Sequence, residues 1–337
     1  MSVPADAPNG VVAVGASAGG VEALQRFAAG LPEDLPYAVL VVLHMPAGAA
    51  SVLAKIMDRS GPLPAVTARD GEVLAAGRIH VGVPDRHLLV DDHHVVLSQG
   101  PTENGHRPAV NALFRSAALQ FGPRAIGVLL SGALDDGVLG LAAIRACGGV
   151  AVVQDPADAL FSGMPRNAIE GGEVDHQLPA SDIGPLLAKL VDRVVEETGM
   201  EQNVTMQLEN RIAMGSRFST EIDGEALGPP SGYTCPDCNG SLMEVQVGNY
   251  RCRVGHAWSS EALLVAHDQE VEGALWVALR SLEEKAKLSR RLAANVGSGP
   301  LYQRYTELAD EAGHAYRVLS TTLEGEYRTS AGAPGES

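Results

Sequence analysis

The sequence predicts a doubly wound α/β domain with a mainly parallel sheet and an added β-hairpin, followed by a small Cys-rich unit and an α-helical hairpin. Two observations predict this fold class. Short apolar runs alternate with longer helical patterns through the first 192 residues, as expected for strands joined by crossover helices. The chain has 337 residues, enough for about two domains, and three of its four Cys residues gather in the second half.

Four runs of Val, Ala, Leu, Ile and Gly are apolar at nearly every position. A strand that is buried on both faces of a parallel sheet has no solvent-facing side, so its sequence does not alternate between apolar and polar residues. We therefore predict buried parallel strands at Val11–Gly15, Ala38–Leu43, Ala125–Leu130 and Val150–Gln154.

Between these strands lie segments with apolar residues at helical spacing, each followed by a glycine. Glycine just after the last helical residue is a common helix stop, because it adopts the left-handed conformation without strain. One stretch differs: His87–Val90 and His94–Ser98 flank two aspartates and predict an antiparallel hairpin on the same sheet. The predicted helices are Val21–Ala29, Ser51–Arg59, Val110–Phe121 and Val138–Cys147.

The pattern changes beyond residue 192, where scattered Gly, Pro and Thr predict a linker that contains some local helix. Two helical segments close the chain, and the second carries an apolar seam from Leu301 to Leu319 that needs burial. We expect the outer face of these helices to bind a protein partner. The predicted divisions after the α/β domain (1–192) are a linker at 193–231, the Cys-rich unit at 232–260, the helical hairpin at 261–327 and a disordered tail at 328–337.

Composition excludes several classes of function. The formal net charge is −16, and neither half of the chain has the basic excess that binding to a phosphate backbone needs, so nucleic acid is not an expected partner. The longest apolar runs are far shorter than the ~18 residues of a membrane span. The first ten residues contain no basic residue and no apolar stretch, which argues against a signal peptide. Four cysteines do not make a disulfide framework, and we expect a cytoplasmic protein.

The first candidate for chemistry is Gly15-Ala-Ser-Ala-Gly-Gly20, between a predicted strand and a predicted helix. A dinucleotide-binding turn needs glycine at its third position, where this chain has Ser17. The segment instead matches G-x-S-x-G, in which small residues let the backbone turn sharply and present the serine hydroxyl. We expect the backbone N–H groups of Ala18 and Gly19 to stabilise an oxyanion there. The alternative is that Ser17 only caps the helix.

A histidine and several aspartates follow the other predicted strands. His44 follows the second strand, Asp135 and Asp136 follow the third, and Asp155 follows the fourth. The carboxyl ends of parallel strands meet at one edge of the sheet, where the binding crevice of an open α/β sheet lies. A serine, a histidine and a carboxylate brought together at that edge can act as a nucleophile, a base and an orienting acid. Spacing alone leaves open which aspartate is the partner.

Several segments, in order from about residue 10 to 192, strongly resemble the catalytic domain of the CheB-type chemotaxis methylesterases. They are VVAVGASAGGVEAL, VLHMP, HRPAVNALF, LLSGALDDGVLGLAAI, and GGVAVVQD followed by FSGMPRNAI. The resemblance implies that Ser17 is the nucleophile, His44 the base and Asp136 the carboxylate that orients the histidine. It also implies a protein-glutamate methylesterase that acts on chemoreceptors, and in many members also deamidates receptor glutamines. Such hydrolysis needs no cofactor.

The chain departs from the family pattern at three places. Only ten residues precede the first strand, whereas members usually begin with a phosphoacceptor receiver domain, so we expect no control by a receiver. The turn before Asp136 begins with Ala133, whose backbone N–H is a further candidate oxyanion donor. Asn111 stands where an aspartate is common, and Arg107 either contacts substrate or braces its loop. A non-catalytic signalling adaptor that docks receptors is the alternative function.

The second candidate site is Cys235-Pro-Asp-Cys238 followed by Cys252 and His256. Two short knuckles with three thiols and one imidazole are a common ligand set for structural Zn²⁺, and a unit of this size has little core without a metal. We therefore predict a zinc-ribbon-like unit; reduced core cysteines are the alternative. Because the predicted triad lies in another domain, we expect catalysis to survive loss of the metal. Likewise, truncation after about Arg193 should spare turnover of a small ester while weakening receptor recognition.

The remaining histidines and the fourth cysteine carry weaker signals. The other histidines, including the pair His93 and His94, lack metal-ligand spacing and are expected to be solvated. Cys147 ends a helical pattern without a partner, which predicts a buried free thiol.

Overall fold

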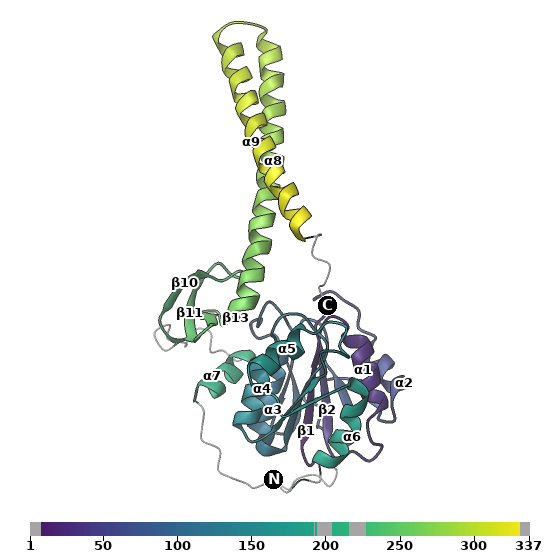
Figure 1. Cartoon of the computed structure of the whole chain (residues 1–337). Coiled ribbons are helices and arrows are strands. Elements are labelled where there is room, and N and C mark those ends of the chain that lie inside the picture. Colours follow the sequence, from purple (N-terminus) through teal and green to yellow (C-terminus); the bar gives the residue numbers. More distant parts are fainter. Residues whose placement is uncertain (1–7, 192, 194–203, 216–226, 331–337) are drawn as a thin grey trace. The chain divides into compact units, whose positions relative to one another are not determined.

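The computed structural model describes residues 8–191, 193, 204–215 and 227–330 (Figure 1). The chain divides into two compact units, Met1–Leu263 and Leu264–Ser337. The first unit contains the α/β part and the Cys-rich unit, and the second contains most of two long helices. None of the described helices is both long enough and apolar enough to cross a membrane.

The α/β part is built on a seven-stranded sheet in which every pair of neighbouring strands is parallel. The predicted fold class is therefore confirmed. The strand order is β3-β4-β2-β1-β7-β8-β9, so β1 lies between β2 and β7, where the strand order reverses. The strands are β1 (Val11–Ala16), β2 (Ala38–Leu43), β3 (Ala65–Thr67), β4 (Ile79–Val81), β7 (Ala125–Leu129), β8 (Val150–Gln154) and β9 (His176–Leu178).

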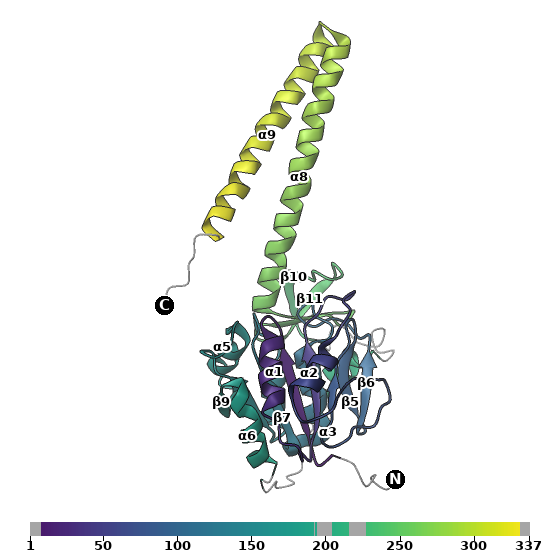
Figure 2. The ribbon, with the colours of Figure 1, turned by 90° about the vertical axis from the view of Figure 1, so that its right-hand side faces the viewer.

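Helices cover both faces of this sheet, as Figure 2 shows from the side. Alternate residues of β1 belong to two different hydrophobic clusters: Val11 and Ala13 pack towards α3 and α4, whereas Val12 and Val14 pack towards α1 and α6. Burial on both faces explains why the strand sequences are continuously apolar. The helices of this part are α1 (Gly20–Ala29), α2 (Leu53–Ser60), α3 (Val110–Phe121), α4 (Val138–Ala146), α5 (Gly163–Glu170) and α6 (Ala180–Leu190), with a 3₁₀ turn at Gly122–Arg124.

The elements that the sequence did not predict are mostly short. The strands β3, β4 and β9 have three residues each, too few for a hydrophobic period to be recognised. The predicted hairpin is present as β5 (His87–Asp91) and β6 (His94–Ser98), but the expectation that it joins the main sheet is wrong. The two strands form a separate two-stranded sheet, which packs on α3 through β5 and is linked to the preceding segment by an isolated bridge between His94 and Val73.

The segment expected to be a linker contains a helix that packs on the α/β part. This helix, α7 (Val204–Ala213), contacts α3, and its Met206 belongs to the same hydrophobic cluster as the core of α3 and α4. The Cys-rich unit follows as a four-stranded antiparallel sheet. Its strands are β10 (Pro230–Thr234), β11 (Ser241–Gln246), β12 (Asn249–Cys252) and β13 (Ala257–Ser259).

Two long helices, α8 (Ser260–Val296) and α9 (Pro300–Ser330), supply the second unit from Leu264 onward. They are joined by a turn containing two glycines in the left-handed conformation. Small and apolar residues are buried along both helices, whereas several large apolar side chains remain exposed. The helix α9 extends three residues into the predicted tail, and 331–337 lie outside the described residues. The buried residues include Leu279, Ala286, Ala293, Ala309, Ala312 and Leu323, and the exposed ones include Val271, Trp276, Val277, Leu288 and Val318.

Candidate active site

Three loops at the carboxyl edge of the sheet bring together a serine, a histidine and an aspartate. Ser17 follows β1, His44 follows β2 and Asp136 lies in the loop after β7. The Oγ of Ser17 is 3.1 Å from the Nδ1 of His44, and the Nε2 of His44 is 2.7 Å from an Oδ atom of Asp136. The side chains of His44 and Asp136 are only 6% and 3% exposed, so this chain of hydrogen bonds is shielded from bulk water.

Glycines on both sides of Ser17 allow the turn to form. A Cβ on Gly15 would lie 2.2 Å from a methyl group of Val110, and one on Gly20 would lie 2.7 Å from the Cβ of Ala16. Gly19 has φ +67° and is itself the N-cap of α1, which receives no side-chain hydrogen bond. The alternative that Ser17 caps the helix is therefore wrong, because its hydroxyl faces His44 instead.

Asp136 is held by three donors. Besides His44, the backbone N–H groups of Val110 and Asn111 donate to its carboxylate at 2.7 and 3.0 Å from the start of α3. Burial by itself would raise the pKa of Asp136, but the hydrogen bonds from His44 and from the backbone N–H of Val110 outweigh it and hold this pKa below its ordinary value. An ionised carboxylate only accepts, so the Nε2 of His44 carries its proton and Nδ1 is free to accept from Ser17.

The other two candidate aspartates do not reach His44. Asp135 accepts a hydrogen bond from the Ser259 hydroxyl at 2.9 Å, and burial raises its pKa to about 6. Asp155 accepts from the backbone N–H of Ala157 at 2.8 Å and closes its own turn. Of the three aspartates that follow strands, Asp136 is the one that contacts the histidine.

Asn111 has a structural position rather than one that faces a substrate. Its side-chain oxygen accepts hydrogen bonds from the backbone N–H groups of Gly137 and Gly140, at 3.0 and 2.8 Å. These two groups belong to the first turn of α4, whose N-cap Gly137 has φ +104°. Asn111 therefore ties the start of α4, and with it the Asp136 turn, to α3.

The backbone N–H groups proposed as oxyanion donors can be checked for existing acceptors. The N–H of Ser17 is used, because it donates to the carbonyl of Ser131 at 2.9 Å. Among the residues that the structure describes, no acceptor is bonded to the N–H groups of Ala18, Gly19 or Ala133. An oxyanion hole requires N–H groups that are not already bonded to another acceptor, and these three meet that condition.

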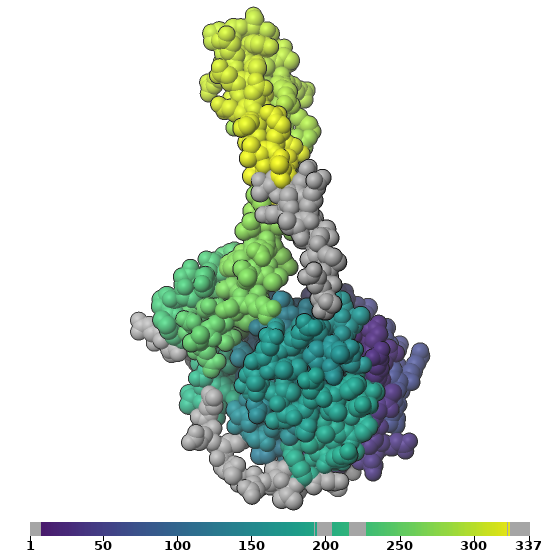
Figure 3. All heavy atoms as spheres, in the orientation of Figure 1, coloured from purple at the N-terminus to yellow at the C-terminus, as the bar shows by residue number. Residues whose placement is uncertain are grey.

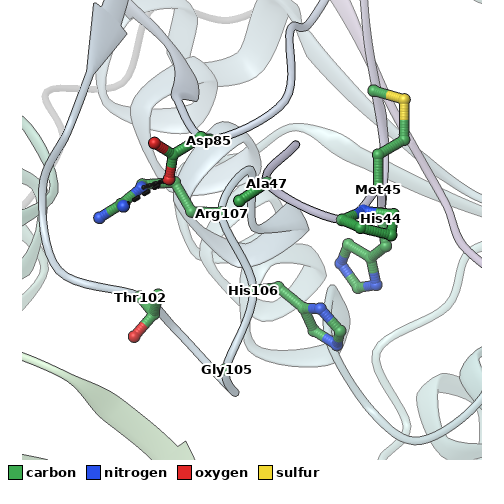
Figure 4. Close-up of a pocket in the computed structure, with 9 residues that line it drawn as sticks. His44, Met45, Ala47, Asp85, Thr102, Gly105, His106 and Arg107 are labelled. Atoms are coloured by element: carbon green, nitrogen blue, oxygen red, sulfur yellow. Dashed lines mark hydrogen bonds and ion pairs between the residues drawn. The ribbon is translucent and has the colours of Figure 1, made fainter. Parts of the chain in front are cut away.

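A cleft of about 470 Å³ opens beside His44 (Figure 4). Arg107 lines it, but the guanidinium is already occupied. It donates to Asp85 through Nε and Nη2, at 3.0 and 2.5 Å, and to the carbonyl of Gly100 at 2.9 Å. Of the two alternatives for Arg107, bracing its loop is the one that these contacts favour. The residues lining the cleft are His44, Met45, Pro46, Ala47, Asp85, Thr102, Gly105, His106 and Arg107.

The expectation that the remaining histidines are solvated is wrong for three of them. His80 and His87 are fully buried, in β4 and β5. The imidazole of His106 stacks on that of His44, with ring centroids 3.7 Å apart and planes inclined by 15°. Burial, together with the neighbouring His44, lowers the pKa of His106 to about 4, so its ring is neutral at pH 7. The only sequence signal for this residue was its position next to Arg107 in a segment shared with the resembled family. Cys147 is buried and free, as expected.

The four predicted metal ligands form one cluster in the Cys-rich unit. The ligand atoms of Cys235, Cys238, Cys252 and His256 all lie within 4.8 Å of one another. The Nδ1 of His256 is 3.7 Å from the sulfur of Cys235 and 3.5 Å from that of Cys252, and the sulfurs of Cys238 and Cys252 are 3.6 Å apart.

Comparison with known proteins finds similarity over the α/β part. The family described as CheB methylesterase matches residues 12–187. A protein-glutamate methylesterase/protein-glutamine glutaminase of Anaeromyxobacter dehalogenans is 44% identical over 190 residues, which cover 56% of each chain. One of Moorella thermoacetica is 38% identical over 187 residues, covering 54% of this chain and 44% of the relative. The chain thus spans about half the length of these relatives.

A solved structure is similar as well. The catalytic domain of the Thermotoga maritima CheB methylesterase is 31% identical, with a TM-score of 0.52. The similarity covers all of that domain and 56% of this chain. The Cys-rich unit at 230–259 lies outside the residues matched by the family.

Proposed function

The chain belongs to the CheB methylesterase family, and we propose on this premise that it hydrolyses glutamate γ-methyl esters through an acyl-enzyme on Ser17. The observation that carries the proposal is the buried chain of hydrogen bonds from Ser17 through His44 to Asp136, beside unused backbone donors. Nucleophile, base and oxyanion donors are the groups that acyl transfer requires.

The reaction follows from the positions of these groups. The Nδ1 of His44 takes the proton of the Ser17 hydroxyl as the oxygen attacks the ester carbonyl. The N–H groups of Ala18, Gly19 and Ala133 receive the oxyanion of the tetrahedral intermediate. As the C–O bond to the methoxy group breaks, His44 returns the proton and methanol leaves. Water then attacks the acyl-enzyme by the same route and releases the free glutamate and Ser17.

We propose methyl-accepting chemoreceptors as substrates, supported by the family and by the names of the relatives. Receptor glutamine is a second candidate, because an amide forms the same acyl-enzyme and releases ammonia instead of methanol. A non-catalytic adaptor is the rival. It would have no need of an aspartate held by three donors or of a serine presented to a histidine, so the geometry favours an enzyme.

One assay separates these possibilities. Purified protein is incubated with methylated receptor and with amidated receptor, and methanol and ammonia are measured. Ser17→Ala is the control, and it should lower the rate by several orders of magnitude without changing the fold. Methanol release that depends on Ser17 supports the methylesterase, and ammonia release adds the deamidase. No release from either substrate would leave the adaptor as the better description.

For the Cys-rich unit, we propose one structural Zn²⁺ bound by Cys235, Cys238, Cys252 and His256. Zn–S and Zn–N bonds of about 2.3 and 2.0 Å give a tetrahedron with edges of about 3.5–3.8 Å. The three ligand–ligand distances given above fall in this range, which supports a tetrahedral ion. Four protein ligands leave no open position, so the metal would be structural. Metal analysis of protein purified without chelator should find one zinc per chain, and its absence would reject the site.

We also propose a cytoplasmic location. Three thiol ligands must stay reduced to hold a metal, and the cytoplasm keeps them so. Fractionation of cells that express the full chain would test this directly.

A further inference from the structure

The loop that carries His106 is attached to the Cys-rich unit through the residues at 102–104. Ala257 donates to the carbonyl of Thr102 at 3.1 Å, and the N–H of Asn104 donates to the carbonyl of Ala257 at 2.8 Å, so that the loop pairs with β13. The Thr102 hydroxyl donates to Asp237 at 2.5 Å, and the N–H of Ser259 donates to the side chain of Asn104 at 2.8 Å. Figure 3 shows the Cys-rich unit in green against the α/β part.

A buried ionic network reinforces this attachment. Glu103 is 3% exposed and forms an ion pair with Arg115 of α3 at 2.5 Å and with Arg251 of the Cys-rich unit at 3.6 Å. Arg251 is 2% exposed and also pairs with Glu209 of α7 at 3.1 Å. Charges at this depth are tolerated only while each retains its partners, so the network holds the three elements and the loop in one arrangement.

The residues that make these contacts are close in sequence to the Cys₃His cluster. Asp237 lies between the first two cysteines, Arg251 precedes Cys252, and Ala257 follows His256. In addition, Arg251 donates to the carbonyl of Gly255, the residue directly before His256, at 2.7 Å. The conformation of the cluster therefore determines where Asp237, Arg251 and Ala257 lie, and these residues contact the loop that carries His106.

The same unit also contacts the other loop of the active site. The Ser259 hydroxyl donates to Asp135, the residue before Asp136, at 2.9 Å. Asn167 of α5 donates both to Glu261 at 2.8 Å and to the carbonyl of Leu134 at 3.0 Å, which joins the start of α8 to that turn.

We propose that the Cys-rich unit positions the two active-site loops, so that an intact Cys₃His cluster is required for full catalytic rate. Asp237 and Ser259 are the positioning residues. The first acts through Thr102 on the loop that stacks His106 on His44, and the second acts on the turn that carries Asp136. The proposal rests on the proposed esterase. It is contrary to the expectation from the sequence, which was that catalysis survives loss of the metal because the triad and the metal ligands lie in different domains.

Variants of the full chain test the contact at Asp237. Asp237→Ala removes the acceptor for Thr102 and should lower kcat by about 10- to 100-fold, since displacement of a catalytic group by about 1 Å has an effect of this size. Asp237→Asn keeps an acceptor oxygen and should restore most of the rate. Val247→Ser alters a side chain that is 95% exposed on the same unit and serves as the matched control. Equal activity of Asp237→Ala and the control would overturn the proposal.

Metal withdrawal with a chelator tests the cluster itself, with a readout that does not depend on activity. Hydrogen exchange of the peptide segments 101–108 and 133–137 is measured before chelation, after it and after Zn²⁺ is added back. We expect faster exchange in both segments on chelation, with recovery on refilling and a parallel change in kcat. Unchanged exchange in both would refute the proposal whatever the activity. A wild-type protein that hydrolyses neither ester nor amide would contradict the proposed function, and exchange would still decide whether the loops depend on the cluster.

Discussion

The imidazole rings of His44 and His106 lie in a parallel stack, 3.7 Å between centroids. His44 is thereby held by three contacts: Ser17 at Nδ1, Asp136 at Nε2 and His106 against the ring plane. Because burial and the neighbouring His44 lower the pKa of His106 to about 4, the stack at neutral pH is between uncharged His106 and the base. We therefore expect His106 to orient the imidazole of His44 rather than to transfer a proton.

The first prediction concerns this stack. His106→Ala removes the ring that supports His44 and should lower kcat by about 10- to 100-fold, because the base loses its fixed orientation. His106→Phe keeps a flat, neutral ring and should stay within about 10-fold of wild type. Steady-state kinetics on a small methyl ester measure both. A Phe variant as impaired as the Ala variant would show that the imidazole nitrogens, not the stacking, are required.

The second prediction separates the neighbouring aspartates. Asp136 accepts from three donors, and an amide in its place offers one oxygen and places an N–H against donors. Asp136→Asn should therefore lower kcat by about 10⁴-fold through loss of the correct histidine tautomer. Asp135→Asn keeps an acceptor for Ser259 and should lose far less. The rate of ester hydrolysis by the two purified variants tests this prediction. A larger loss of activity in Asp135→Asn than in Asp136→Asn would reject Asp136 as the orienting acid.

The third prediction is a pH dependence of stability. Burial raises the pKa of Asp135 from 3.8 to about 6, so the folded protein binds this proton more tightly than the unfolded chain. Stability from this group is present below pH 3.8 and is lost as pH rises through about 6. Asp135→Asn should therefore increase the free energy of unfolding at pH 7 by about 1 kcal/mol, after allowance for partial exposure. Denaturant unfolding at pH 4 and pH 7 tests this, and an equal difference at both pH values would contradict it.

The fourth prediction concerns the buried network. Glu103→Ala removes the carboxylate that Arg115 and Arg251 share and leaves Glu209 to balance both buried guanidinium groups, which should cost about 3–5 kcal/mol of stability. Arg26→Ala breaks an ion pair in which the arginine is 57% exposed, and should cost less than about 1 kcal/mol. Thermal unfolding of the two variants is compared. Similar small losses would mean that the network contributes little net free energy.

The fifth prediction distinguishes the Cys-rich unit from the two long helices. A chain that ends after Gly273 keeps Asp237, Arg251 and Ser259, and should turn over a small ester at the wild-type rate. A chain that ends after Arg193 lacks these contacts and should be strongly impaired. If the exposed apolar residues of the helices bind a receptor complex, both truncations should raise the KM for intact receptor. If the chain that ends after Gly273 has the wild-type KM for intact receptor, the long helices have no docking role.

Elements with a local signal could be predicted from the sequence. Continuous apolar runs predicted β1, β2, β7 and β8 nearly to their ends, because burial on both faces leaves its mark on every residue of a strand. The same runs placed Ser17 and His44 at one sheet edge, since parallel strands end together there. Ligand spacing likewise predicted the group that the four metal-binding candidates form in the fold.

Contacts between segments that are far apart in the chain could not be predicted from the sequence and are seen only in the folded structure. Spacing left three aspartates open, and only the fold brings the carboxylate of Asp136 within 2.7 Å of His44 while Asp135 turns to Ser259. Neither the stacking of His106 nor the ion pairs of Glu103 has any periodicity that a sequence pattern could reveal. Such contacts depend on which surfaces meet when the chain packs, and that is set by the free energy of the whole fold rather than by any one segment.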